Sequence, residues 1–122
     1  MVAATDSKAH QGSELIPPEL QDRQEMAHCH CILPNPSHPK WVAVCDLGLS
    51  AVFIYELDTV HGALHGAYDD PRHLRLDAGA GCRHCIWSAD GNTLFVNNGT
   101  HASHPQLSGY LSSKIEQNMI SY

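Results

Sequence analysis

The stretch from residue 27 to residue 58 constrains the fold of this chain most. It contains three short segments rich in β-forming residues, at 28–32, 41–45 and 51–55, and turn-forming residues separate them. Because both connections are short, sequential antiparallel pairing into a meander is the expected topology. A shorter fourth strand is expected at 61–66, after another turn.

The pattern then begins again. Residues 84–86 (His-Cys-Ile) can be set over residues 30–32, and residues 94–96 over residues 42–44, with a two-residue difference in the intervening turns. A strand–turn–strand unit that recurs at about 50 residues, with four strands in each unit, is typical of β-propeller blades. Two unrelated hairpins in a small β domain are the alternative interpretation.

We therefore predict an all-β chain, a β-propeller fragment of about one and a half four-stranded antiparallel blades with irregular terminal tails. The expected parts are a loop or tail with one helical turn near its end (1–26), a blade (27–66), a connection (67–81), a half blade (82–98) and a divergent tail without further strands (99–122). The spacing of Leu111, Ile115 and Met119 predicts a helix in that tail. Because propellers need about four or more blades to close, the chain is expected to be a fragment.

Composition excludes several partners. Thirteen acidic residues against seven basic ones give a formal net charge of −6, which disfavours binding to nucleic acid or to an anionic membrane. The N-terminus has no signal-peptide pattern, and no apolar run approaches the roughly 20 residues that span a bilayer. Five cysteines without secretory context predict reduced thiols in a cytoplasmic protein.

Four stretches carry a resemblance to a known family: RQEMAHCH (23–30), VCDLG followed by VFIY (44–55), GCRH (81–84) and DGNTLFVNN (90–98). In this order they resemble segments of the seven-bladed β-propeller lactonases. Those segments are an Arg-Gln run before Pro-His-x-His, V-x-D-L-G-x-D-x-V-x-x-Y, Gly-Pro-Arg-His and D-G-x-x-x-Y-V-x-N-E. The family includes the propeller type of 6-phosphogluconolactonase and the fungal carboxy-cis,cis-muconate cyclases. The resemblance covers roughly residues 10–100, about a third of a full-length member.

The resemblance implies a set of site residues. It places His28 first and His30 second on the central cavity, with His28 as the candidate base that activates water. Arg83 is the expected anion-binding group, because a guanidinium offers a rigid fork of donors. His84 and Asn98 are expected to contact substrate. The family's glutamate falls at Asn98, whose amide cannot exchange a proton near neutral pH.

Other interpretations of the same residues stay open. On a regular strand His28 and His30 share one face while Cys29 and Cys31 share the other, and the two histidines could be polar rim residues bonded to nearby backbone. A Cys/His zinc site could also be built from the cysteines and histidines of the two repeats, namely Cys29, Cys31, Cys82, Cys85, His28, His30 and His84. Small core residues are the favoured interpretation of these cysteines, so we expect no metal and no cofactor.

Two functions are expected as alternatives. The first is a lactone hydrolase that opens sugar lactones with water in carbohydrate metabolism, with a small-molecule lactone as its partner and self-association if the propeller is to be closed. The second is a truncated non-catalytic remnant, or a mis-joined gene product, of the same family.

Overall fold

The structure is a computed structural model that describes residues 4–10, 24–67, 69–70 and 72–99 and the backbone of 111–113. Within these residues the chain forms strands and no helix. The strands are β1 (Cys29–Pro34), β2 (Trp41–Asp46), β3 (Ala51–Asp58), β4 (Ala63–His65), β5 (Leu74–Arg75), β6 (Cys82–Trp87), β7 (Leu94–Asn98) and β8 (Leu111–Ser113). The all-β, propeller-like architecture predicted from the sequence is therefore confirmed.

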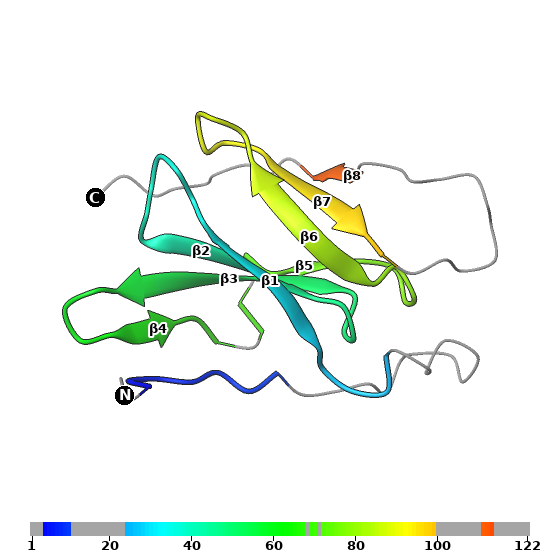
Figure 1. Ribbon diagram of the computed structural model, residues 1–122, viewed down its shortest axis with the longest axis horizontal. Coiled ribbons are helices and arrows are strands. Elements are labelled where there is room, and N and C mark those ends of the chain that lie inside the picture. The colour runs from blue at the N-terminus through cyan, green and yellow to red at the C-terminus, as the bar shows by residue number, and fades with distance from the viewer. Residues whose placement is uncertain (1–3, 11–23, 68, 71, 100–110, 114–122) are drawn as a thin grey trace.

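The first sheet is the predicted meander. β1, β2, β3 and β4 pair antiparallel in chain order (Figure 1). β5, which lies in the predicted connection, pairs with the start of β3, whereas β4 pairs with its end. β4 and β5 thus both pair with the same edge of β3, and the connection that contains β5 pairs with the first sheet again before β6 begins.

The second sheet has the order β6-β7-β8. The prediction that the tail contains no strand, and begins a helix at Leu111, is wrong for the described part: Leu111–Ser113 pairs antiparallel with β7, Phe95 opposite Ser112. The open edge of β7 presents unpaired backbone donors and acceptors, and pairing with it outweighs a weak helical spacing. The rest of the predicted helix, and most of the predicted turn before residue 24, lie outside the described residues.

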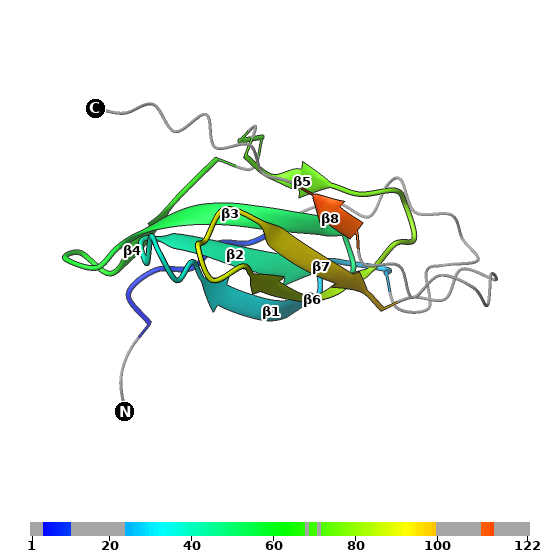
Figure 2. The same cartoon turned by 90° about the horizontal axis from the view of Figure 1, so that it is seen from above.

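The two sheets pack through an apolar core. β6 lies against β1 and β2, and Figure 1 shows β6 and β7 above β2 and β3; Figure 2 looks down on the same packing, with β7 in front of the first sheet. The core consists of buried residues from facing sides, namely Ala43, Cys45, Val52, Ile54, Cys82, Trp87, Leu94 and Val96. Cys31 and Cys85 pack against it. Four of the five cysteines therefore serve as small apolar residues at the blade interface.

The opposite face of the first sheet carries a second cluster that includes Phe53 and Tyr55. The segment 4–10 crosses this side of the molecule: Thr5 Oγ1 donates to the carbonyl of Gly62 at 2.7 Å. The ring of His10 stacks on Phe53 with centroids 3.8 Å apart. An aromatic layer on this blade face is thus covered by the chain's own N-terminal segment.

Each blade has a β-bulge at the same place in its first strand. In β1 the register shifts between Cys29 and Cys31, and in β6 it shifts between Cys82 and His84. The extra residues are therefore His30 and Arg83. A bulge residue has no partner on the neighbouring strand, and bulges often re-aim side chains at functional sites.

The bulges correct the sequence alignment of the two repeats. Ile32 pairs with Val44, and Cys85 pairs with Val96, so Cys85 corresponds to Ile32 and the turns differ by one residue rather than two. A one-residue shift moves a side chain to the other face of a sheet. This is why Cys31 and Cys85 both enter the core between the sheets although they occupy the same place in the His-Cys-Ile motif.

Candidate active site

Three of the predicted site residues meet where the two sheets adjoin. The Nε of Arg83 on β6 donates to Nε2 of His30 on β1 at 3.3 Å. The rings of His30 and His84 lie edge to face, with centroids 4.9 Å apart. All three side chains are exposed, so this cluster, which we call the bulge cluster, is open to a ligand.

The hydrogen bond fixes the chemistry of His30. A guanidinium can only donate, so Nε2 of His30 is the acceptor in this contact. The Arg83 side chain also lies against the backbone of Gly99, where a Cβ atom would approach Arg83 Cδ to 2.7 Å. Glycine at this position leaves room for the guanidinium stem. The bulge cluster thus presents a held cation that can bind a carboxylate, a phosphate or a carbonyl oxygen that gains charge.

His28 makes contacts other than those of the bulge cluster. Its Nε2 contacts Oε1 of Glu25 at 3.0 Å, and its amide donates to Oδ1 of Asp46 at 2.9 Å. Among the described contacts none joins His28 to His30 or Arg83. A backbone hydrogen bond, followed by that of His28, lowers the pKa of Glu25, so this pair joins an ionised carboxylate to an imidazole. Such a pair orients a histidine and leaves its Nδ1 free to accept a proton.

Asn98 stands at the end of β7, opposite Cys82 and next to the bulge. Its Oδ1 is buried and has no hydrogen-bond partner among the described residues. A buried acceptor without a donor costs about 1–3 kcal/mol. The position that carries glutamate in the resembled family therefore holds an amide whose oxygen has no partner among the described residues.

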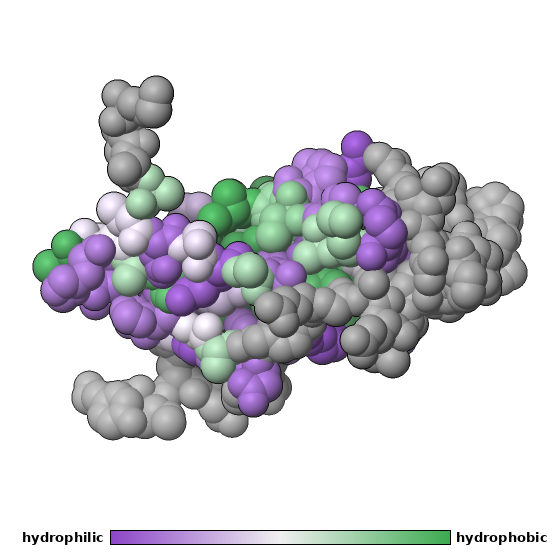
Figure 3. Space-filling view, turned by 90° about the horizontal axis from the view of Figure 1, so that it is seen from below, coloured by the Kyte–Doolittle hydropathy of each residue, from purple (hydrophilic) through white to green (hydrophobic). Residues whose placement is uncertain are grey.

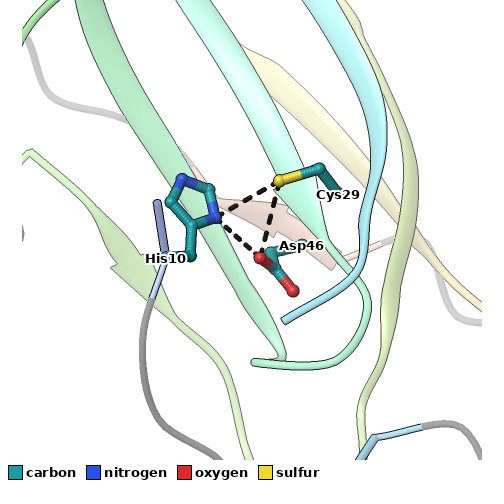
Figure 4. Close-up of side chains that lie close together, drawn as sticks. All are labelled: His10, Cys29 and Asp46. Atoms are coloured by element: carbon teal, nitrogen blue, oxygen red, sulfur yellow. Dashed lines mark hydrogen bonds and ion pairs between the residues drawn. The ribbon is translucent and has the colours of Figure 1, made fainter. Parts of the chain in front are cut away.

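The structure also assembles a group that the sequence did not indicate. Nδ1 of His10 lies 2.6 Å from Oδ2 of Asp46 and 3.3 Å from Sγ of Cys29 (Figure 4). The other ring nitrogen contacts the Tyr55 hydroxyl at 2.8 Å. Segment 4–10 has no sequence periodicity that would place His10 against this sheet, so the sequence did not predict this group of side chains. The only sequence signal for it was Asp46, which belongs to the D-L-G motif.

Two opposing effects set the pKa values in this group. Burial alone would raise the pKa of Asp46, but hydrogen bonds from His10 and from the amides of His28 and Leu49 outweigh burial and lower it. Cys29 is exposed as a residue, but partial desolvation of its sulfur, together with the neighbouring Asp46, raises the pKa of the thiol to about 11. The arrangement is not a nucleophile–base–acid relay, because Cys29 and Asp46 both contact the same nitrogen of His10.

The zinc site considered from the sequence is not formed. Cys29 faces His10, while Cys31 lies in the core between the sheets; the bulge in β1 breaks the alternation that would place them on one face. All five cysteines are free. A hydrogen bond between Cys45 and Cys85 raises the pKa of the first thiol and lowers that of the second.

A pocket of about 400 Å³ lies beside the β3–β4 loop, away from the bulge cluster, and its lining includes Lys40, Glu56 and His65.

Hydrophobic residues gather near the middle of one face of the molecule, with hydrophilic residues around them (Figure 3). The described residues contain no helix that could span a membrane.

A family model described as "Lactonase, 7-bladed beta-propeller" matches residues 2–102 of the 122. The chain belongs to this lactonase family. Membership of this family relates the position of the bulge cluster to the central channel that the blades of a propeller surround. β6 packs against β1 and β2, while β4 lies at the far edge of its sheet (Figure 1). The bulge cluster therefore lies on the side where the two blades of this lactonase-family chain converge.

Solved structures share the fold of this lactonase-family chain. A candidate 6-phosphogluconolactonase of Bacteroides fragilis aligns over 77% of the chain with a TM-score of 0.62 and 24% identity. The periplasmic gluconolactonase PpgL of Pseudomonas aeruginosa aligns over 96% with a TM-score of 0.63 and 24% identity. A protein of Lactobacillus plantarum aligns over 75% with a TM-score of 0.55 and 28% identity.

The chain spans only part of each of these structures: 26% of the Bacteroides protein, 33% of PpgL and 23% of the Lactobacillus protein. A search of curated proteins gives no match to the sequence. The lactonase family and the propeller fold are thus established for a chain much shorter than its structural relatives.

Proposed function

We propose that this chain is part of a lactone hydrolase of the 6-phosphogluconolactonase-like family, which opens a sugar lactone with water. The observation that carries the proposal is the contact between Arg83 and His30, which joins a cation to an imidazole on the converging side of two adjacent blades. Two structural relatives, one named as a candidate 6-phosphogluconolactonase and one as a gluconolactonase, support the substrate class.

The proposed reaction uses the residues in separate roles. Nδ1 of His28, with the ring held by Glu25, takes a proton from water as the water oxygen bonds to the lactone carbonyl carbon. Arg83, held by its hydrogen bond to His30, stabilises the charge that develops on the carbonyl oxygen, and His84 contacts the substrate beside it. The ring C–O bond then breaks, the proton passes to the leaving oxygen, and a hydroxy acid results.

Arg83→Gln tests this proposal. The purified 122-residue chain is assayed on a 6-phosphogluconolactone and on an unphosphorylated gluconolactone, over a concentration range that includes self-association. Rates are corrected for spontaneous hydrolysis. Arg83→Gln is expected to lower kcat/KM by about 100-fold or more, which is typical for loss of an oxyanion-stabilising group. Lys40→Gln removes an exposed charge elsewhere and should leave the rate unchanged. Equal rates for Arg83→Gln and the parent chain would refute the assignment.

The second candidate is a non-catalytic remnant of the same family, favoured by the unsatisfied amide of Asn98. Asn98→Glu introduces the acid/base group that the resembled family has, whereas Asn98→Gln lengthens the side chain without it. If the glutamate role applies, Asn98→Glu should raise the rate and Asn98→Gln should not. No hydrolysis by any of the three chains, whether monomeric or assembled, would favour the remnant.

We also propose that the chain is cytoplasmic and that it associates with further propeller blades, in other copies or in a longer chain. Five free cysteines support a reducing compartment, although PpgL is named as periplasmic. Cell fractionation with immediate alkylation of thiols tests the location. Sedimentation velocity tests association, since closure requires at least about four blades.

A further inference from the structure

Outside the bulge cluster, three metal-binding side chains converge on one point from three separate segments. His10 comes from the N-terminal segment, Cys29 from the start of β1 and Asp46 from the end of β2 (Figure 4). The shortest distances are 2.6 Å from Nδ1 to Oδ2, 3.3 Å from Sγ to Nδ1 and 3.6 Å from Sγ to Oδ2. One nitrogen, one oxygen and one sulfur atom thus lie within 3.6 Å of one another.

These separations resemble the edges of a tetrahedral zinc site. Zinc binds imidazole nitrogen and carboxylate oxygen at about 2.0 Å and thiolate sulfur at about 2.3 Å, which sets its tetrahedral ligands roughly 3.3–3.6 Å apart. Both distances from the sulfur already lie in that range. The shorter contact between His10 and Asp46 is a hydrogen bond, and it would lengthen when a metal ion replaces the shared proton.

The groups around the three side chains hold them in place for coordination. Oδ1 of Asp46 accepts the amides of His28 and Leu49, at 2.9 Å and 3.0 Å, which leaves Oδ2 directed at the other two ligands. Nε2 of His10 contacts the Tyr55 hydroxyl, as the second nitrogen of a metal-bound histidine commonly does with a polar partner. The His10 side chain is only 3% exposed, and its ring rests on Phe53.

The ligand chemistry selects the ion. A thiolate, an imidazole and a carboxylate suit zinc and its neighbours in the first transition row, whereas magnesium and calcium require oxygen ligands. His10 and Asp46 are buried but Cys29 is exposed, so a metal ion can enter from the Cys29 side and keep a fourth position for water.

We propose that His10, Cys29 and Asp46 bind one zinc ion, which fastens the N-terminal segment to the hairpin of β1 and β2. Binding forms Zn–N, Zn–O and Zn–S bonds and releases the Cys29 thiol proton and the proton shared by His10 and Asp46 to solvent. None of its three ligands belongs to the bulge cluster or takes a role in the proposed lactonase reaction, although Oδ1 of Asp46 accepts the amide of His28.

The test uses the 122-residue chain stripped of metal and titrated with Co²⁺, a spectroscopic substitute for zinc. We expect tetrahedral d–d bands, a thiolate-to-cobalt charge-transfer band, saturation at one ion per chain, and loss of these bands when Zn²⁺ is added. Cys29→Ala should remove the charge-transfer band and weaken affinity by more than the roughly 10–100-fold that loss of an outer-shell partner costs. Because Cys29 is exposed, this variant is expected to keep the fold, and circular dichroism checks that it does.

Cys31→Ala is the matched control, since it removes a thiol two residues away that faces the core between the sheets. It should keep both the charge-transfer band and the metal affinity. As a second readout, Zn²⁺ should raise the Tm of the parent chain and of Cys31→Ala but not that of Cys29→Ala, and Mg²⁺ should raise none of them. The proposal is overturned if the parent chain shows no charge-transfer band, or if Cys29→Ala retains it.

Discussion

Among single residues, His73 shows how a buried ring can replace backbone pairing. Its Nδ1 accepts the amide of Ile54 at 3.0 Å, and its Nε2 donates to the carbonyl of Ala67 at 2.7 Å. Both bonds require a neutral ring with its proton on Nε2. Burial lowers the pKa of His73 below its ordinary value of 6.5, although the hydrogen bond to the Ala67 carbonyl and the charge of Asp70 oppose this effect; the charges of Arg75 and Arg72 add to it.

This pKa shift predicts a pH-dependent stability. A base whose pKa is lower in the folded state takes up its proton first in the unfolded chain, so the free energy of unfolding falls as pH drops below about 6.5. One proton gives a slope of at most about 1.4 kcal/mol per pH unit, and the loss is complete below the folded-state pKa. Denaturant unfolding between pH 7.5 and 5 measures it. His73→Gln should reduce this slope, while His38→Gln, in the β1–β2 turn, should not; an unchanged slope in His73→Gln would contradict the assignment.

At the scale of elements, the turn between β2 and β3 is built around Gly48. A Cβ atom there would lie 1.7 Å from the carbonyl oxygen of Met26, so the chain before β1 crosses directly over this turn. The amide of Leu47 donates to the carbonyl of His28 at 2.9 Å and fixes the same crossing. The glycine is required by the close approach of backbone rather than by its own dihedral angle.

Gly48→Ala is therefore expected to destabilise the chain by about 3 kcal/mol, near the upper end of the usual overpacking range, because the atom in the way belongs to backbone. Chemical denaturation followed by circular dichroism measures the change. Thr59→Ala, in the exposed β3–β4 turn, should shift the free energy of unfolding by less than about 0.5 kcal/mol. If Gly48→Ala unfolds at the same denaturant concentration as the parent chain, the close approach of Met26 to Gly48 does not constrain this turn.

The elements that the sequence predicted correctly are those that carry a local signal. β1, β2, β3, β6 and β7 are short runs of β-formers bounded by turn residues, and such runs are visible without tertiary information. β5 has two residues and pairs with the edge of β3, and β8 has three residues and pairs with the edge of β7. Both are strands because of this pairing and not because of a local sequence pattern. A bulge likewise leaves no clear mark in the sequence, so the register of the repeats was wrong by one residue.

The same distinction applies to the sites. His30, Arg83 and His84 were indicated by their resemblance to a family, and the structure brings them together. His28 came from the same resemblance, and the structure places it beside Glu25 instead. The group around Asp46 depends on a contact between residues 36 positions apart that includes a segment without pattern, and such a contact is visible only in the fold.

At the scale of the whole molecule, the packing between the two sheets decides whether they behave as one unit. Leu94 is fully buried in that interface, whereas Ile86, on the neighbouring strand, is 62% exposed. The two residues are isomers, so their truncation to alanine removes the same number of carbon atoms from very different surroundings.

Leu94→Ala is expected to cost about 3 kcal/mol, within the range for truncation of a buried leucine, and Ile86→Ala less than about 0.5 kcal/mol. Thermal melting followed in parallel by circular dichroism and tryptophan fluorescence measures both changes, because Trp87 lies in the same core. A small effect of Leu94→Ala, or separate transitions for the two probes, would mean that the sheets fold independently.

The paired bulges also bear on how such a protein can evolve. His30 and Arg83 stand outside the paired positions of the β-ladders and are exposed, so their replacement removes neither a ladder pair nor a buried contact. Mutational drift at these two positions is therefore nearly free of a stability penalty. In the proposed lactonase site, these two positions can therefore exchange charge and reach while the strand pairing of both sheets is retained.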